Sequence, residues 1–197
     1  MKCLIVNAHP LPKSLCVHLR KQVQKQLLQA GHQVEVEDLY EVGFKPSLSE
    51  KERHSYYEQQ YKMAGVADQA LKLVNTQVLI LIFPTWWFGF PAILKGWFDR
   101  VWSPGIAFDH AKDFAPIKGR LNKLKHVLVI TSLGSPWWVD WLIMRRPVKR
   151  IIKHGLVGAC APHAKVNFLS IYQAENLPPE KIKSFLMRIE RAIMSWQ

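Results

Sequence analysis

Residues 78–91 read Val-Leu-Ile-Leu-Ile-Phe-Pro-Thr-Trp-Trp-Phe-Gly-Phe-Pro, and this stretch decides the fold. The aliphatic run over 78–82 is typical of a strand buried on both faces, as the strands of parallel sheets are. After it the chain breaks at Pro84, presents three adjacent aromatic residues, and reaches a glycine and a second proline. Because open α/β sheets bind ligands at the carboxyl ends of their strands, the stretch also predicts a ligand site.

Strand and helix patterns alternate on both sides of this stretch. Before it we expect a strand at 3–6, an amphipathic helix at 14–30, an edge strand at 34–37, a loop at 46–61 leading into a helix near Glu50, and a helix at 66–74. After it we expect a helix from Pro91, placed in its first turn, to Trp102, a strand at 127–131, a tryptophan-rich segment, a basic helix, a weaker strand at 164–169, and a last helix opened by residues 178–180.

This alternation predicts an α/β fold of βαβ units with a parallel sheet. Five strands, with a single phosphate-type loop after the first, favour a flavodoxin-like three-layer sandwich whose strand order is 2-1-3-4-5. Neither a GxGxxG nor a Walker A sequence follows the first strand, which argues against a dinucleotide-binding Rossmann site and a phosphate-loop NTPase. We expect residues 1–197 to form one domain.

Charge and cysteine content narrow the class of protein. The chain has 27 Lys and Arg against 15 Asp and Glu, a surplus that attracts polyanions, anionic membrane surfaces or phosphorylated small molecules. No helix-turn-helix, zinc-finger or RNA-binding motif is present, so we expect no nucleic-acid partner. The three cysteines lack metal-site spacing and the N-terminal apolar run is too short for a signal peptide, which predicts a reduced, cytoplasmic protein without a metal.

Three loops at the carboxyl ends of neighbouring predicted strands form the candidate site. In the first loop, residues 9–15, helix N–H groups and the Ser14 hydroxyl suit a phosphate, and His9 and Lys13 are expected to add positive charge, although Ser14 could equally be a plain helix cap. In the second, the amides of residues 85–88 suit the polar edge of a flat heterocycle with Trp87 or Phe88 packing beside it.

The second loop has an alternative interpretation, since its aromatic side chains could instead be core or dimer contacts. The third loop, residues 131–136, carries small hydroxyl residues that allow close approach to a heterocycle, or it is an ordinary turn. The coincidence of all three loops at one sheet edge is what favours a bound flavin.

Two blocks of the chain carry a family resemblance. They are Asn7-Ala8-His9-Pro10 with Lys13-Ser14-Leu15, and Phe83-Pro84 through Trp87-Phe88-Gly89 to Pro91-Ala92-Ile93-Leu94-Lys95-Gly96-Trp97-Phe98-Asp99-Arg100-Val101. Together they resemble the NAD(P)H:quinone oxidoreductases, including the "modulator of drug activity B" relatives. The resemblance implies a flavodoxin-like homodimer with FMN or FAD, which passes a hydride from NAD(P)H to the flavin and two electrons to a quinone-like acceptor.

The resemblance also implies the site residues. The phosphate end is assigned to His9, Ser14, Leu15 and Cys16; one edge of the isoalloxazine to Pro84, Thr85, Trp86, Trp87 and Phe88; the other edge to Thr131, Ser132, Leu133 and Gly134. No side chain is expected to act as a nucleophile, because the flavin carries the chemistry. We expect the aromatic face around 87–102 to be buried in the dimer.

The chain departs from the family at several of these positions. Cys16 stands where an Asn is common, Leu133 replaces a glycine, and the Tyr and His that follow the third loop are absent between residues 134 and 153. Tryptophans occupy that segment instead, and we expect Trp137 or Trp138 to cover the flavin and contact the substrate. Aromatic residues beside cations also suit a bilayer interface or a protein groove. The alternative is therefore a non-catalytic regulatory subunit that docks on a membrane transporter, with peripheral membrane contact.

Overall fold

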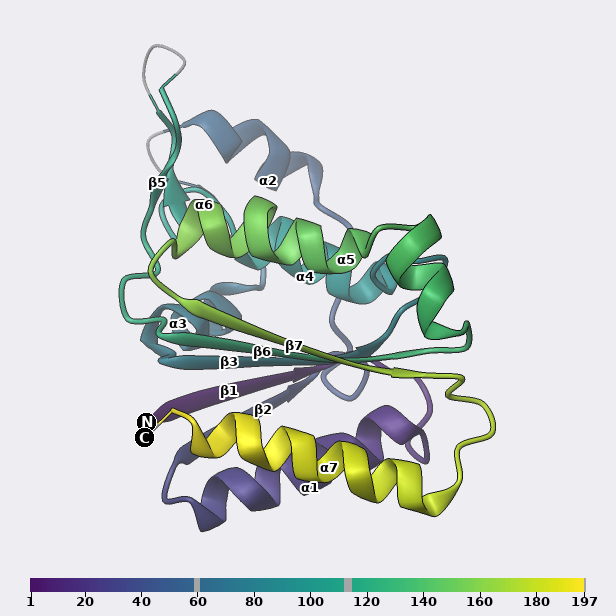
Figure 1. The fold of residues 1–197 in the computed structure, drawn as a ribbon. Helices are drawn as coiled ribbons and strands as arrows, with labels where there is room; N and C mark the ends of the chain where they lie inside the picture. The colour runs from purple at the N-terminus through teal and green to yellow at the C-terminus, as the bar shows by residue number, and fades with distance from the viewer. Residues whose placement is uncertain (59–60, 112–114, 197) are drawn as a thin grey trace.

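Five parallel strands form the centre of the protein in the order β2-β1-β3-β6-β7 (Figure 1). The computed structural model of the chain describes residues 1–58, 61–111 and 115–196. The strands are β1 (Lys2–Asn7), β2 (Gln33–Asp38), β3 (Val78–Pro84), β6 (His126–Leu133) and β7 (Lys165–Tyr172). A two-residue antiparallel pair, β4 (Phe108–Asp109) and β5 (Lys118–Gly119), lies outside this sheet and was not expected. Without it the order is the predicted 2-1-3-4-5, which confirms the flavodoxin-like fold.

Helices cover both faces of the sheet and complete the three layers. They are α1 (Leu15–Gln29), α2 (Glu50–His54), α3 (Ala67–Asn75), α4 (Ala92–Val101), α5 (Pro147–Arg150), α6 (Gly158–Cys160) and α7 (Pro179–Met194), with a 3-10 turn η1 (Ser55–Tyr57) and two π-helical segments, η2 (Val139–Ile143) and η3 (Ile151–Val157). In Figure 1, α1 and α7 lie below the sheet, and α4 and the α5–η3–α6 run lie above it.

The expected boundaries need four corrections. β6 continues to Leu133, so residues 131–133 of the predicted third loop belong to the strand. Pro91 is the N-cap of α4 and lies outside its first turn, and β7 continues three residues beyond the predicted end at 169. The expected basic helix exists, but a π-helical segment interrupts it. Residues 59 and 60 of the predicted loop at 46–61 lie outside the described residues.

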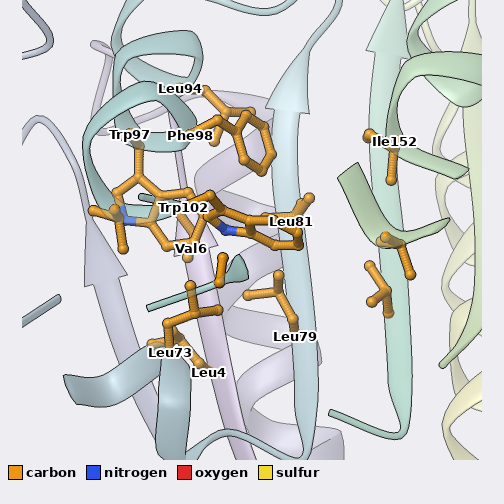
Figure 2. Close-up of a cluster of buried hydrophobic side chains, with 14 of the residues drawn as sticks. Leu4, Val6, Leu73, Leu79, Leu81, Leu94, Trp97, Phe98, Trp102 and Ile152 are labelled. Atoms are coloured by element: carbon orange, nitrogen blue, oxygen red, sulfur yellow. The ribbon is translucent and has the colours of Figure 1, made fainter. Parts of the chain in front are cut away.

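The core above the sheet is dominated by α4 (Figure 2). Trp97 is fully buried, and its ring packs edge-on against Phe98 and Trp102 with centroids 5.4 and 6.5 Å apart. Such large aromatic side chains contribute much of the hydrophobic stabilisation of a small domain. The expectation that the aromatic face around 87–102 is buried in a dimer is therefore wrong for these three residues, which lie in the core of their own chain.

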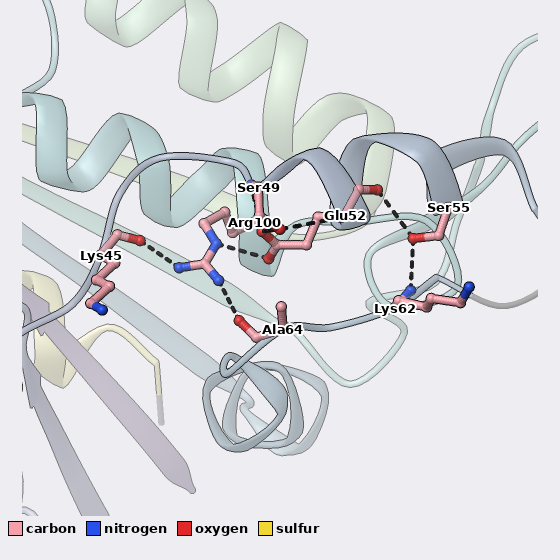
Figure 3. A network of polar contacts seen from close by, with 7 residues as sticks. All are labelled: Lys45, Ser49, Glu52, Ser55, Lys62, Ala64 and Arg100. Carbon is pink, nitrogen blue, oxygen red and sulfur yellow. Dashed lines mark hydrogen bonds and ion pairs between the residues drawn. The ribbon is translucent and has the colours of Figure 1, made fainter.

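A buried ion pair fixes the outer side of α4 (Figure 3). Arg100 donates from Nε to Oε1 of Glu52 at 2.8 Å, and its other nitrogens donate to the carbonyls of Lys45 and Ala64. Burial alone would raise the pKa of Glu52, but hydrogen bonds from Ser49 and Arg100 together hold it below its ordinary value. These contacts thus tie Lys45, Glu52 and Ala64 to the helix that follows the second loop.

Gly96 allows this segment to approach α4 closely. A Cβ atom built on Gly96 would lie 2.1 Å from the carbonyl oxygen of Pro46, which no side chain can tolerate.

Among the described residues, no helix combines the length and the apolar character that crossing a bilayer requires.

Candidate functional site

The three predicted loops meet at the carboxyl edge of the sheet. Beyond the strands, Ala8 donates its N–H to Ile82 O at 3.0 Å, and Thr85 donates to Ser132 O at 2.8 Å. The hydroxyl oxygens of Thr85 and Thr131 are 2.6 Å apart. The first two loops also touch, because the rings of His9 and Trp86 lie edge to face with centroids 6.3 Å apart. These contacts join the first loop to the second and the second to the third.

Ser14 caps α1 and leaves its hydroxyl proton free. Its Oγ accepts the Val17 N–H at 3.3 Å, so the same hydroxyl can still donate to a ligand. Leu15 and Cys16 stand in the first turn, where helix N–H groups lack intrahelical partners and favour an anion. The Cys16 thiol is buried and lies 3.9 Å from Ser132 Oγ, so the backbone of Cys16, and not its side chain, is the part that could meet a phosphate.

His9 is set up as a neutral hydrogen-bond donor. Its Nδ1 accepts the Leu11 N–H at 3.0 Å, which places the ring proton on Nε2. Desolvation lowers the pKa of His9, and the smaller opposing effects of the Leu11 contact and of the Asp38 charge do not offset it. The imidazole is therefore mainly neutral at pH 7. The positive charge expected from His9 is thus corrected to an N–H donor, and Lys13 remains as the exposed cation of the first loop.

The second loop is a strained turn that points its aromatic residues outward. Trp86 and Gly89 exchange both backbone hydrogen bonds, at 3.2 and 2.8 Å, and the residues between them have positive φ values of 49° and 55°. This turn normally requires Asn or Gly at those places. Pro84 is buried, Trp86 is 43% exposed and Trp87 is completely exposed. The N–H groups of Trp87 and Phe88 donate to no described residue and remain available to a ligand.

Leu133 does not block the solvent-facing side of the third loop. Leu133 is 4% exposed and pairs in register with Tyr172, and its side chain lines a small internal cavity with Arg146 and Val148. The side chain that replaces the family's glycine thus packs inward. Gly134 follows, and a Cβ there would lie 3.1 Å from Glu175 Oε1, so Gly134 keeps room between this loop and the loop after β7.

Backbone strain gathers at this edge of the sheet. In the part of the chain that the structure describes, five residues other than glycine have positive φ, and all lie in loops that follow β3, β6 or β7: Trp87, Phe88, Arg145, Arg146 and Gln173. Each such residue costs of order 1–3 kcal/mol and persists where the surroundings impose it, often at functional sites. The strain supports this edge as the candidate site.

A polar cluster behind the third loop was not predicted. Tyr172 donates its hydroxyl to Asp140 Oδ2 at 2.8 Å and accepts the Trp141 indole N–H at 3.0 Å. Arg146 Nε lies 4.0 Å from the same carboxylate, and its guanidinium stacks 4.3 Å from the Trp141 ring centroid. Desolvation raises the pKa of Tyr172, and the contact with Asp140 adds to this effect, while the contact with Ser170 opposes it. The lone acid of a basic segment, Asp140, was the sequence signal that could have revealed the cluster.

The predicted substrate residues lie beside this cluster and are open to solvent. Trp137 is 56% exposed and Trp138 is 46% exposed, just before η2. Their role as a cover of the flavin stays a prediction. No group of His, Cys, Asp and Glu that could hold a metal occurs among residues 1–58, 61–111 and 115–196.

Comparison with known proteins agrees with this geometry. The family described as flavodoxin-like fold matches residues 1–178. Human ribosyldihydronicotinamide dehydrogenase (quinone) is 36% identical over 124 residues, 55% of this chain and 54% of the human protein. The chain spans about half the length of the curated relatives it matches.

Solved structures cover nearly the whole chain. The NAD(P)H:quinone oxidoreductase from Methanothermobacter marburgensis has a TM-score of 0.81 and 27% identity, over 98% of this chain and 95% of that one. An FMN-dependent NADH-azoreductase from Bacillus anthracis, solved in complex with FMN, has a TM-score of 0.76 at 17% identity, over 100% of this chain and 99% of that one. The second likeness concerns the fold alone.

Proposed function

This chain belongs to the family of the flavodoxin-like fold, and we propose that it is a flavin-dependent NAD(P)H oxidoreductase that reduces a quinone-like acceptor. The names of its relatives support the reaction class, since the human protein is named a dehydrogenase (quinone) and the Methanothermobacter marburgensis protein an NAD(P)H:quinone oxidoreductase. We place the reaction at the carboxyl edge of the sheet, in the cytoplasm, with FMN or FAD as the cofactor.

One observation carries the proposal. The strained turn at 86–89 holds two N–H groups that donate to no partner among the described residues, and it lies beside the hydroxyl pair of Thr85 and Thr131 and near the N-terminus of α1. A heterocycle with a polar edge and a phosphate tail needs donors in this arrangement. The inward packing of Leu133 leaves the backbone of the third loop accessible, so the residues present fit a flavin.

Each part of the chain has a defined task in this proposal. When bound, a flavin supplies the two-electron chemistry between NAD(P)H and the acceptor. The amides of residues 87–88 orient the ring, and the buried Thr85–Thr131 hydroxyl pair aligns the second and third loops beside it. The α1 N-terminus with Ser14 and His9 Nε2 binds the phosphate. Tyr172 and Asp140 hold an exchangeable proton at the edge of the site, where an acceptor oxygen needs one.

The absorbance spectrum of the purified protein tests the proposal. We expect the visible bands of oxidised flavin, bleached under nitrogen by NAD(P)H and restored by a quinone. Extraction of the cofactor and chromatography then distinguish FMN from FAD. A colourless protein that takes up neither FMN nor FAD on reconstitution contradicts the proposal.

A further inference from the structure

The segment at 137–154 exposes an unusual set of apolar side chains at the carboxyl edge of the sheet. We call it the aromatic–basic surface. Its exposed apolar members are Trp137, Trp138, Trp141, Leu142, Ile143, Met144 and Ile151. Leu142 and Ile143 are 67% and 62% exposed, although apolar side chains of this size are usually buried. An exposed apolar patch of this extent marks an interaction surface.

Polar contacts beneath the aromatic–basic surface hold its segment in place. Asp140 is buried and accepts the hydroxyl of Tyr172, which in turn accepts the indole N–H of Trp141. Arg146 packs between the rings of Trp141 and Phe168, at 4.3 and 5.5 Å from their centroids. These contacts tie η2 to β7, so that the apolar side chains of η2 are presented to solvent on a fixed support.

The charges of the segment favour an anionic partner. Between residues 137 and 154 there are five basic residues, Arg145, Arg146, Lys149, Arg150 and Lys153, and one acidic residue, Asp140. The acid is buried against Tyr172, so the exposed charge of the surface is positive throughout. A second copy of the same surface would bring like charges together, which costs free energy. The surface of an anionic bilayer would attract the cations and would also bury the apolar side chains.

We propose that the aromatic–basic surface docks the protein on a bilayer that contains anionic lipids. Tryptophan rings settle at the headgroup level, and the leucine and isoleucine of η2 enter the acyl boundary. Arg145, Arg150 and Lys153 lie beside them and attract anionic headgroups. The docking is separate from the redox proposal, because it requires no flavin. It would place the carboxyl edge of the sheet next to the membrane.

Vesicle sedimentation tests the docking. The full chain is mixed at low salt with vesicles of phosphatidylcholine alone, or of phosphatidylcholine with phosphatidylglycerol. We expect binding only to the second kind, and a fall in the partition coefficient with added salt. The double variant Leu142→Ser/Ile143→Ser should bind at least tenfold more weakly, and Arg150→Ala/Lys153→Ala about tenfold or more.

Matched variants on other faces serve as controls. Leu28→Ser/Leu71→Ser removes exposed leucines from α1 and α3, and Lys25→Ala/Lys183→Ala removes two exposed charges from α1 and α7. Both should bind as the unmodified chain does. The proposal is overturned if the chain stays in the supernatant with anionic vesicles, if Leu142→Ser/Ile143→Ser binds unchanged, or if the controls lose binding equally.

Sedimentation velocity tests the other possible occupant of the aromatic–basic surface, a second copy of the chain. If Leu142→Ser/Ile143→Ser converts a dimer into a monomer, a second copy covers the surface and the membrane proposal is wrong. An oligomeric state unchanged by this substitution, together with lost vesicle binding, supports the membrane.

Discussion

The hydroxyl oxygens of Thr85 and Thr131 lie 2.6 Å apart, on the loop after β3 and near the end of β6. Thr131 is 2% exposed, so Thr131→Val removes this hydrogen bond without creating a cavity. We expect a loss of about 1 kcal/mol in the free energy of unfolding, measured by urea titration, and a several-fold loss of flavin affinity. Thr131→Ser keeps the hydroxyl and should restore the flavin affinity, although the loss of a buried methyl group costs about 1 kcal/mol of stability. Equal affinity in the valine variant would show that the pair does not align the two loops.

Ser14 combines a helix cap with the proposed phosphate contact, and the two roles can be separated. Ser14→Ala combined with His9→Ala should weaken flavin binding at least tenfold, since each lost bond to a charged group costs about 1.5–3 kcal/mol. Ser14→Asp keeps a good N-cap residue and so should preserve the thermal midpoint. Its carboxylate would repel a phosphate, and flavin retention should fall nevertheless. Retained flavin in Ser14→Asp would place the phosphate elsewhere.

The fold could be predicted because its signals are local. Unbroken apolar runs at 78–82 and 127–130 indicate buried parallel strands, and α1 and α7 follow helical spacing. The internal position of Trp97 and Trp102 could not be predicted, since α4 is apolar on several faces and its outer side is covered by the distant segment at 45–64. Similarly, the strand signal fades at residue 169 because Ser170 is polar, although β7 continues to Tyr172.

The candidate site was predicted where it depends on strand ends and missed where it depends on tertiary contact. The convergence of the three loops follows from strand order alone. The contact of Asp140 with Tyr172 joins two elements far apart in sequence, and no local pattern announces it. Positive φ values at Trp87 and Phe88 also oppose local preference, which is why the turn could be recognised only from the structure.

Cations near the mouth of the site should favour NADPH over NADH. The 2′-phosphate adds an anion, and Arg145 is an exposed cation held in a left-handed conformation after η2. We expect Arg145→Ala to raise KM for NADPH about tenfold, the value of one bond to a charged group, with little change for NADH. Lys183→Ala on α7 is the control. Steady-state kinetics with both donors across ionic strength measure the effect, and an unaltered ratio in Arg145→Ala would contradict it.

Because Glu37 of β2 is buried, its ionisation should lower the free energy of unfolding as the pH rises. It is 1% exposed, and neither carboxylate oxygen has a hydrogen-bond partner among the described residues. Desolvation raises the pKa of Glu37 above the ordinary 4.5. The charge of Lys72 and the nearby indole of Trp97 lower this pKa without offsetting the desolvation, and the indole N–H makes no hydrogen bond to a described residue. Above pH 4.5 the folded chain therefore holds this proton more tightly than the unfolded chain does, and stability falls with increasing pH until the folded pKa is passed.

Glu37→Gln removes this titration and keeps the side-chain shape. We expect the variant to be more stable than the unmodified chain at pH 7, and the difference to shrink towards pH 4.5. Urea midpoints between pH 4.5 and 8 measure it. Glu190 is exposed on α7, far along the chain from Glu37, and Glu190→Gln is the control for the loss of a surface carboxylate. A constant difference between Glu37→Gln and the unmodified chain at every pH would refute the assignment.

The tryptophans after the third loop should cover the flavin. Trp137 and Trp138 follow Gly134 within a few residues and are exposed, so their indoles lie within a short length of chain of the third loop, where we place one edge of the ring. A cover of this kind would exclude water and favour flat, apolar acceptors over small polar quinones. We expect strong quenching of tryptophan and flavin fluorescence, relieved in Trp137→Ala or Trp138→Ala together with a shift of kcat/KM towards polar quinones. Trp196→Phe, at the opposite edge beside His126, is the control. If both alanine variants keep full quenching and the same acceptor profile, the segment does not cover the flavin and serves only the aromatic–basic surface.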